Sequence, residues 1–121
     1  NRFNNLDYSL QLLDGIKTDF KKCIYALKEY QKGNHHQAFR YFHEYLKTKN
    51  YILEHFLINK VYGSLLLEVK QYHQAKLCFT KAVQLRPGDL EVHQLLAQVH
   101  DLLDEQREKQ VELDIINLLE V

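Results

Sequence analysis

The residues of this chain that could do chemistry are its histidines and carboxylates. The chain has seven His, and two of them, His93 and His100, stand seven residues apart in a helical pattern, with Asp104 four residues further on. This spacing puts three possible metal ligands on one side of a helix. Histidines that are solvated or hydrogen-bonded within the domain give the same pattern. The sequence favours the second interpretation, so we expect no metal and no other cofactor.

A second group of candidates is acidic: Asp101, Asp104, Glu105 and Glu108. Two carboxylates can work as general acid and base, but acidic residues spread over a helix surface are more often a solvated face. The sequence contains no glycine-rich phosphate loop, no G-x-S-x-G elbow, no H-E-x-x-H and no paired C-x-x-C. We therefore expect a protein without catalysis of its own.

The two cysteines, Cys23 and Cys78, stand singly inside helical patterns. Such residues are typical of small buried side chains in a reducing compartment, and a disulfide or a reactive thiol is the alternative. This pattern favours a cytoplasmic or nuclear protein.

Composition and charge exclude several classes of partner. The chain has 16 basic and 16 acidic residues, so no basic field gathers nucleic acid or an anionic membrane. No apolar run approaches the length of a membrane span, and one Pro and four Gly favour a compact helical domain. The chain begins at Asn1 and contains no Met, which favours a piece of a longer polypeptide.

Apolar periodicity predicts about seven helices. We expect them over residues 1–18, 19–31, 35–47, 52–69, 72–85, 90–103 and 105–121. The first presents an apolar stripe of Phe3, Leu6, Leu10 and Leu13. It is interpreted as a capping helix or half of a truncated repeat, or else as an amphipathic segment that binds a groove of its own or of a neighbouring molecule.

The stretch from Phe56 to Asp89 organises the chain. Gly63 and Ala75 let two antiparallel helices approach closely, Phe79 fills the space between them, and Pro87 ends the second helix. The residues at fixed spacing are Asn59, Tyr62, Gly63, Leu66, Tyr72, Ala75, Phe79, Ala82 and Pro87. This pattern resembles the 34-residue tetratricopeptide repeat (TPR). It departs from that pattern at Asn59, Tyr62 and Leu66, where the family has Trp, Leu and Tyr.

The flanking segments resemble the same pattern less closely. Upstream, Ala38 and Phe42 match Ala75 and Phe79, and Ala26 takes the place of Gly63. The interval from Ala38 to Ala75 is 37 residues, so about three extra residues lie around Thr48 to Tyr51. Downstream, Leu96 and Ala97 match Tyr62 and Gly63, but Lys109 stands where Ala75 stood.

The resemblance implies an all-α fold, a TPR-like right-handed stack of antiparallel helical hairpins. We expect one domain over residues 1–121. It comprises an N-terminal helix or cap (1–18), repeat one (19–52), repeat two (56–89), and a degenerate third repeat with a C-terminal helix (90–121). The apolar residues from Val111 to Leu119 favour a continuing protein or a docking helix, because solenoid ends need a polar outer side.

The resemblance also implies a concave surface, lined by the first helix of each hairpin, that binds a peptide or helix of another protein. The groove candidates are Phe20, Cys23, Ile24, Leu27 and Tyr30 in repeat one, Leu57, Lys60, Val61 and Ser64 in repeat two, and Glu91, Gln94, Leu95 and Gln98 in repeat three. Tyr30 and Lys60 are the strongest candidates for contact. The apolar candidates could instead belong to the core.

One TPR subclass clamps the C-terminal carboxylate of heat-shock proteins with basic and Asn side chains. At the corresponding places this chain has Cys23, Leu27, Val61, Glu91 and Leu95, and only Lys60 supplies a nearby positive charge. A more apolar ligand, such as an amphipathic helix, suits this groove better.

The sequence therefore predicts a non-catalytic module that binds a protein partner as an adaptor or scaffold in a larger complex. The alternatives are a homo-oligomerisation domain that pairs through its terminal apolar helices, and a regulatory or targeting segment of a larger enzyme. We expect neither nucleic-acid binding nor membrane insertion.

Overall fold

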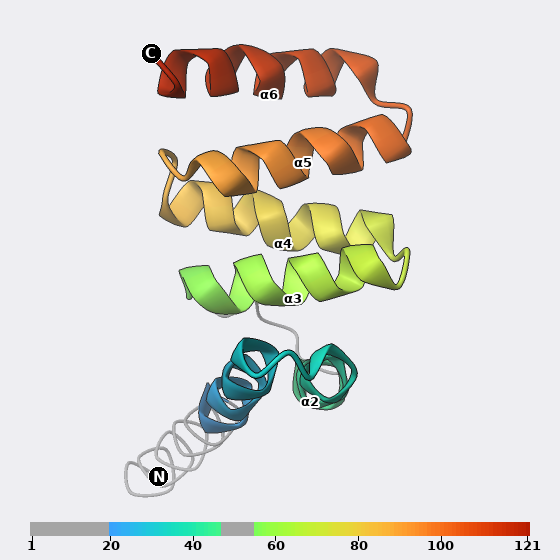
Figure 1. Cartoon of the computed structure of the whole chain (residues 1–121). Helices are drawn as coiled ribbons and strands as arrows, with labels where there is room; N and C mark the ends of the chain where they lie inside the picture. Colours follow the sequence, from blue (N-terminus) through green and yellow to red (C-terminus); the bar gives the residue numbers. More distant parts are fainter. Residues whose placement is uncertain (1–19, 47–54) are drawn as a thin grey trace, which may run out of the picture. The chain divides into compact units, whose positions relative to one another are not determined.

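The computed structural model describes residues 20–46 and 55–121, and every regular element within them is a helix. A first helix covers residues 20–31. It is followed by α2 (His35–Leu46), α3 (Phe56–Glu68), α4 (Tyr72–Leu85), α5 (Leu90–Leu102) and α6 (Gln106–Leu119) (Figure 1). The predicted all-α fold is confirmed. The helix expected over residues 1–18 and the loop at Thr48 to Tyr51 lie outside the described residues. Among the helices described, none is long and apolar enough to cross a membrane.

The chain divides into two compact units, Asn1–Asn50 and Tyr51–Val121. The first contains the helix over residues 20–31 and α2, and the second contains α3 to α6. The boundary falls where the sequence exceeds the 34-residue period. The assignment of residues 1–121 to one domain stays a prediction.

The same turn joins the two helices of each hairpin. Its central residue has a left-handed backbone, with φ of 85° at Gly33, 64° at Lys70 and 58° at Asp104. The next amide donates to the carbonyl five residues earlier: Asn34 to Glu29 (2.9 Å), Gln71 to Leu66 (2.9 Å) and Glu105 to His100 (2.8 Å). This bond is the mark of a Schellman helix end. Glycine adopts the conformation freely, whereas the side chain of Lys70 crowds the backbone there.

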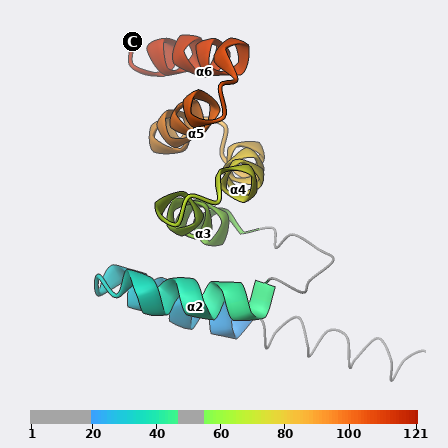
Figure 2. The same ribbon diagram turned by 90° about the vertical axis from the view of Figure 1, so that its right-hand side faces the viewer.

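The second unit is a stack in which α4 packs against both α3 and α5, and α5 packs against α6. α3 also contacts α5. Figure 2 shows the consequence: α3 and α5 lie on one side of this stack and α4 on the other. The first helices of two successive hairpins therefore form one continuous surface.

α3 and α4 approach each other closely where Gly63 faces Phe79. A Cβ atom added to Gly63 would lie 2.7 Å from Cε1 of Phe79 and 3.1 Å from Cβ of Cys78. Phe79, Ala75 and Ala82 are all fully buried. The ring of Phe79 therefore sits directly against the backbone of α3, as the spacing of small residues predicts.

The first unit has a similar core. Cys23 and Ala26 of the helix over residues 20–31 are fully buried, as are Ala38 and Phe42 of α2. Small residues again stand at the crossing, with one large aromatic side chain beside them.

The predicted start of α3 is wrong. The periodicity placed it at Ile52, but the helix begins at Phe56 because His55 has an extended backbone and its Nδ1 accepts a hydrogen bond from the amide of Ile58 (3.3 Å). Burial, and to a lesser degree the charge of Arg86, lowers the pKa of His55 and favours the neutral ring that this bond requires.

We expect Gly63→Ala to lower the free energy of unfolding by about 1–3 kcal/mol, because the fully buried Phe79 has little room to move. Thermal and urea unfolding followed by circular dichroism measure the effect. Gly88→Ala is the matched control, since an added Cβ there meets no atom within 4 Å. Equal stability of the two variants would contradict the close helix approach.

Lys70→Gly should raise the free energy of unfolding by about 0.5–1 kcal/mol, because glycine removes the strain of the left-handed backbone. Lys70→Ala removes the same charge but keeps a Cβ, so it should give no such gain. Unfolding of the two variants side by side separates the backbone effect from the charge effect. A gain in the alanine variant as large as in the glycine variant would exclude the backbone explanation.

Candidate partner-binding surface

The structure brings the predicted groove residues of repeats two and three together on one surface, which we call the α3–α5 face. It consists of Leu57, Lys60, Val61 and Ser64 of α3 and Glu91, Gln94, Leu95 and Gln98 of α5. Leu57 is 45% exposed, Glu91, Gln94 and Gln98 are also exposed, and the other four residues are partly buried. All eight side chains therefore retain surface that a partner can contact.

The five candidates of repeat one belong to the first unit and are arranged differently. Cys23 is fully buried, so the structure places it in the core of its hairpin and not on a contact surface. A side chain with no exposed surface cannot contact a partner, so Cys23 does not fit its assignment to the groove. Phe20 is exposed, while Ile24, Leu27 and Tyr30 are partly buried. The ring of Tyr30 stacks on His35, with 4.6 Å between ring centroids.

Lys60 is the only basic residue of the α3–α5 face, and its charge is already engaged. Its Nζ lies 3.0 Å from Oε2 of Glu91 and 3.5 Å from Oδ1 of Asp89, and it lies 5.5 Å from the ring centroid of Phe56. Only 18% of the Lys60 side chain is exposed. Lys60 therefore ties α3 to the start of α5 and offers little positive charge to a ligand.

A buried pair that the sequence did not predict holds α5 to α6. Nδ1 of His93 lies 2.6 Å from Oε2 of Glu112, and its Nε2 lies 2.6 Å from the carbonyl oxygen of Pro87. The carbonyl can only accept, so Nε2 carries a proton. When the ring is charged, Nδ1–H donates a hydrogen bond to the Glu112 carboxylate.

The pKa of His93 is raised by these contacts. Burial alone opposes the charged ring, but the hydrogen bonds to Glu112 and Pro87, together with the charges of Glu112 and Asp89, outweigh it. The protonated ring therefore joins α5, α6 and the turn before α5. The only trace of this pair in the sequence is that His93 falls on the inward side of its helix, beside Val92 and Leu96.

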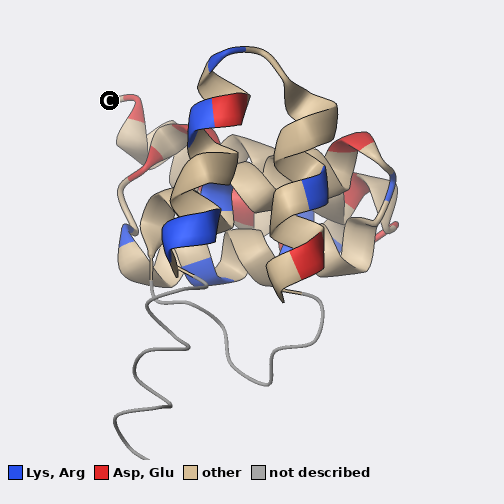
Figure 3. Cartoon of the chain, turned by 90° about the horizontal axis from the view of Figure 1, so that it is seen from below, with Lys and Arg blue, Asp and Glu red and all other residues tan. Residues whose placement is uncertain are grey.

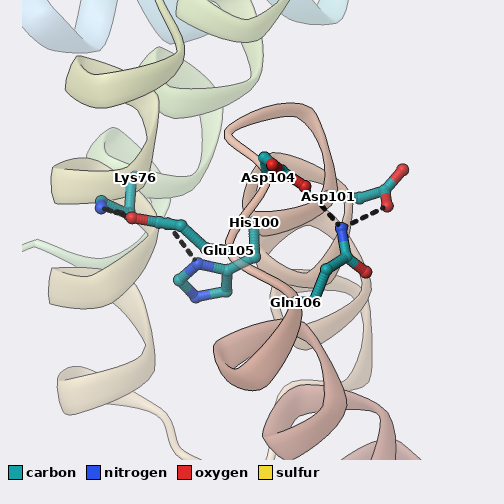
Figure 4. A network of polar contacts seen from close by, with 6 residues as sticks. All are labelled: Lys76, His100, Asp101, Asp104, Glu105 and Gln106. Carbon is teal, nitrogen blue, oxygen red and sulfur yellow. Dashed lines mark hydrogen bonds and ion pairs between the residues drawn. The ribbon is translucent and has the colours of Figure 1, made fainter.

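A second polar network joins α4 to the turn between α5 and α6 (Figure 4). Nζ of Lys76 lies 2.8 Å from Oε2 of Glu105, whose Oε1 lies 2.8 Å from Nδ1 of His100. The hydrogen bonds from Lys76 and His100 lower the pKa of Glu105. On the other side of the turn, Gln106 donates to Asp101 and Asp104. Of the acidic cluster, Glu105 is thus a structural ion-pair partner, while Asp101, Asp104 and Glu108 are exposed.

Within residues 20–46 and 55–121, no three His, Cys, Asp or Glu side chains gather where they could hold a metal ion. His93 and His100 bind separate carboxylates instead. Cys23 and Cys78 are both thiols, and burial raises the pKa of the Cys78 thiol to about 12, so this thiol is a poor nucleophile.

Comparison with known proteins rests on structure. No protein-family model matches the sequence, and no curated protein matches it significantly. A mutant of MamA superposes with a TM-score of 0.67 at 18% identity, covering 84% of this chain and 72% of MamA. The second TPR of Spaghetti (RPAP3), bound to the HSP90 peptide SRMEEVD, gives a TM-score of 0.63 at 13% identity, covering 84% of this chain and 91% of that domain. The chain has a TPR fold.

The TPR fold explains one departure from the repeat pattern. Asn59, which stands in place of Trp, is buried, and its Nδ2 donates to the carbonyl of His55 at 2.9 Å. The amide group is therefore satisfied by the backbone just before α3, so this polar residue costs the TPR core little.

Because the folded pKa of His93 is raised, its stabilising effect is full below the unfolded pKa and is lost as pH rises through the folded value. We expect His93→Gln to lower the free energy of unfolding by about 1.5–3 kcal/mol near pH 6, and by less as pH increases. Urea unfolding of the wild type and the variant between about pH 5 and about pH 9 measures the difference.

The matched control is His73→Gln, on the exposed side of α4. It should follow the wild type at every pH. If the free energy of unfolding of His93→Gln differed from that of the wild type by the same amount at every pH, the ring would stabilise the fold by packing and not through its charge.

Proposed function

We propose that this chain is a non-catalytic module that binds a segment of a partner protein on its α3–α5 face. The observation that supports the proposal is that this face combines exposed apolar surface with exposed amide side chains. Leu57, Val61 and Leu95 supply partly exposed apolar surface, and the exposed amides of Gln94 and Gln98 lie on the same helix as Leu95. Apolar contacts supply affinity, while amides can pair with the backbone of a bound segment.

The comparison with Spaghetti (RPAP3) supports this proposal, since that TPR was captured with a peptide bound. The chemistry of the two ligand surfaces should nevertheless differ. An acidic peptide needs free cations, and here Lys60 is held by Asp89 and Glu91. An apolar or amphipathic segment therefore fits the α3–α5 face better than an acidic C-terminus. We propose that such binding lets the protein act as an adaptor or scaffold in a larger complex.

The test is selection of binding peptides from a random peptide library displayed on phage, followed by titration of the enriched peptides in solution. Leu57→Asp with Gln98→Asp should weaken these peptides at least about tenfold, because it places charge on both helices of the face. The exposed pair His73→Asp with Gln84→Asp on α4 is the control and should bind like the wild type. Unchanged binding by the α3–α5 variant would exclude this face as the site.

The heptapeptide SRMEEVD serves as a probe of ligand polarity. We expect it to bind more weakly than about 1 mM, since no unpaired cation lies on the α3–α5 face. Binding in the micromolar range would show that the module takes acidic ligands after all.

A further inference from the structure

The overall charge balance of the chain conceals a strong local segregation of charge. Residues 89–121, which form the hairpin of α5 and α6, contain nine acidic and only two basic residues. Residues 20–32 contain four lysines and a single glutamate. Over residues 20–46 of the first unit, five Lys and Arg residues stand against two Glu residues, and Figure 3 colours these charges blue and red. Two oppositely charged helical surfaces therefore occur in one molecule.

The first surface lies on α6 and is both apolar and acidic. We call it the α6 ridge: Glu108, Val111, Asp114, Ile115 and Leu118. Val111, Asp114 and Leu118 recur at helical spacing on the side away from the buried Glu112 and Ile116, while Glu108 and Ile115 lie between the two sides. Val111 is 53% and Leu118 is 76% exposed, so α6 presents two large apolar side chains on one exposed side. Arg107, four residues before Val111, is also exposed and adds one positive charge to the same side.

The second surface lies on the helix over residues 20–31 and the turn after it. We call it the lysine face: Lys21, Tyr25, Lys28 and Lys32, at spacings of four, three and four residues. Tyr25 is 47% exposed and lies between the lysines, with Nζ of Lys28 5.8 Å from its ring centroid. Glu29 lies beside the face but is engaged by Lys32 and Asn34.

A comparison between hairpins shows that the lysine face is distinctive. Aligning Ala26 with Ala97 aligns Lys21, Tyr25 and Lys28 with Val92, Leu96 and Val99 of α5. Those three apolar residues are buried. The first helix therefore carries lysines on the side where α5 carries its buried apolar residues. A partner for this side must be acidic, with apolar surface that can contact Tyr25 and the lysine stems.

We propose that the α6 ridge of one molecule binds the lysine face of a second copy of the chain. Lys21 and Lys28 would meet Glu108 and Asp114, while Tyr25 and the lysine methylene groups would cover Val111 and Leu118. Pairing of two identical ridges is disfavoured, because it brings the carboxylates of Glu108 and Asp114 from both copies together. The interface therefore joins two different surfaces, and each added molecule leaves one ridge and one lysine face open.

The first measurement is the mass of the chain by light scattering behind a sizing column, over about a hundredfold range of concentration. At about 0.05 M salt the mass should rise above 14.5 kDa with concentration. At about 0.5 M salt it should return toward the monomer, because salt screens the lysine–carboxylate pairs. A monomer throughout would overturn the proposal, as would an assembly that grows stronger in high salt.

Two variants then test the pairing of unlike surfaces. Lys21→Glu with Lys28→Glu breaks the lysine face, and Val111→Glu with Leu118→Glu breaks the ridge. Each should be monomeric alone, with association weakened at least about tenfold. An equal mixture should form a dimer and nothing larger, because one intact ridge and one intact lysine face remain. Association of either variant alone, or a monomeric mixture, would contradict the proposal.

Controls exclude effects of folding and of charge in general. Leu77→Glu replaces an exposed apolar residue of α4 and Lys70→Glu reverses an exposed lysine, and both variants should assemble like the wild type. If Val111→Glu with Leu118→Glu fails to fold by circular dichroism, Glu108→Lys with Asp114→Lys takes its place. That variant keeps the apolar side chains and should also be monomeric alone. Its assembly would overturn the electrostatic pairing.

Discussion

The contact between Phe79 and the backbone at Gly63 is the constraint on which the second unit depends. It fixes how close α4 lies to α3, and α5 packs on α4 while also reaching α3. Lys60 of α3 also binds two carboxylates at the start of α5. The close approach of α4 at position 63 and these ion pairs together set how α5 lies against α3. A larger residue there would move α4, and the surface formed by the first helices would change with it.

The hairpin of α5 and α6 is held by a different kind of interaction. Lys109 stands where α4 has the small residue Ala75, and its Nζ binds Asp101 at 2.9 Å. The buried pair of His93 and Glu112 adds a second polar link between the two helices. Polar contacts thus hold α5 to α6 where the small residues of the repeat pattern are absent. This explains why the two helices still form a hairpin although their sequence matches the repeat pattern poorly.

The sequence predicts the helices well because their determinants are local. Gly63, Ala75 and Phe79 stand at spacings that only a close helical hairpin explains, and Gly33 marks a turn that recurs at Lys70 and Asp104 with the same backbone. The start of α3 could not be predicted, because the capping bond of His55 breaks a periodicity that continues on both sides.

The candidate site could be predicted only in part. Helical spacing put Leu57 and Leu95 among the groove candidates, and both keep exposed surface, but their contact with a partner stays a prediction. The pairing of His93 with Glu112, and of Lys60 with Glu91, depends on the rotation and offset of one helix against another, which periodicity does not determine. Cys23 was placed on the groove side although it is fully buried, because periodicity alone does not say which side of a helix is covered. The net charge of the whole chain does not reveal that one hairpin is acidic and the other basic, because the opposite charges cancel in the sum.

The two hairpins of the second unit should respond differently to temperature and solvent. The buried residues of α3 and α4 are mainly apolar, and apolar burial weakens on cooling. Lys76–Glu105 and Lys109–Asp101 are partly exposed, so salt screens them, whereas warming lowers the cost of removing charges from water. Low temperature combined with high salt therefore destabilises both hairpins. Higher temperature at low ionic strength favours the hairpin of α5 and α6 over that of α3 and α4. Which of the two neighbouring repeats is the more stable therefore depends on temperature and salt as well as on the amino-acid sequence.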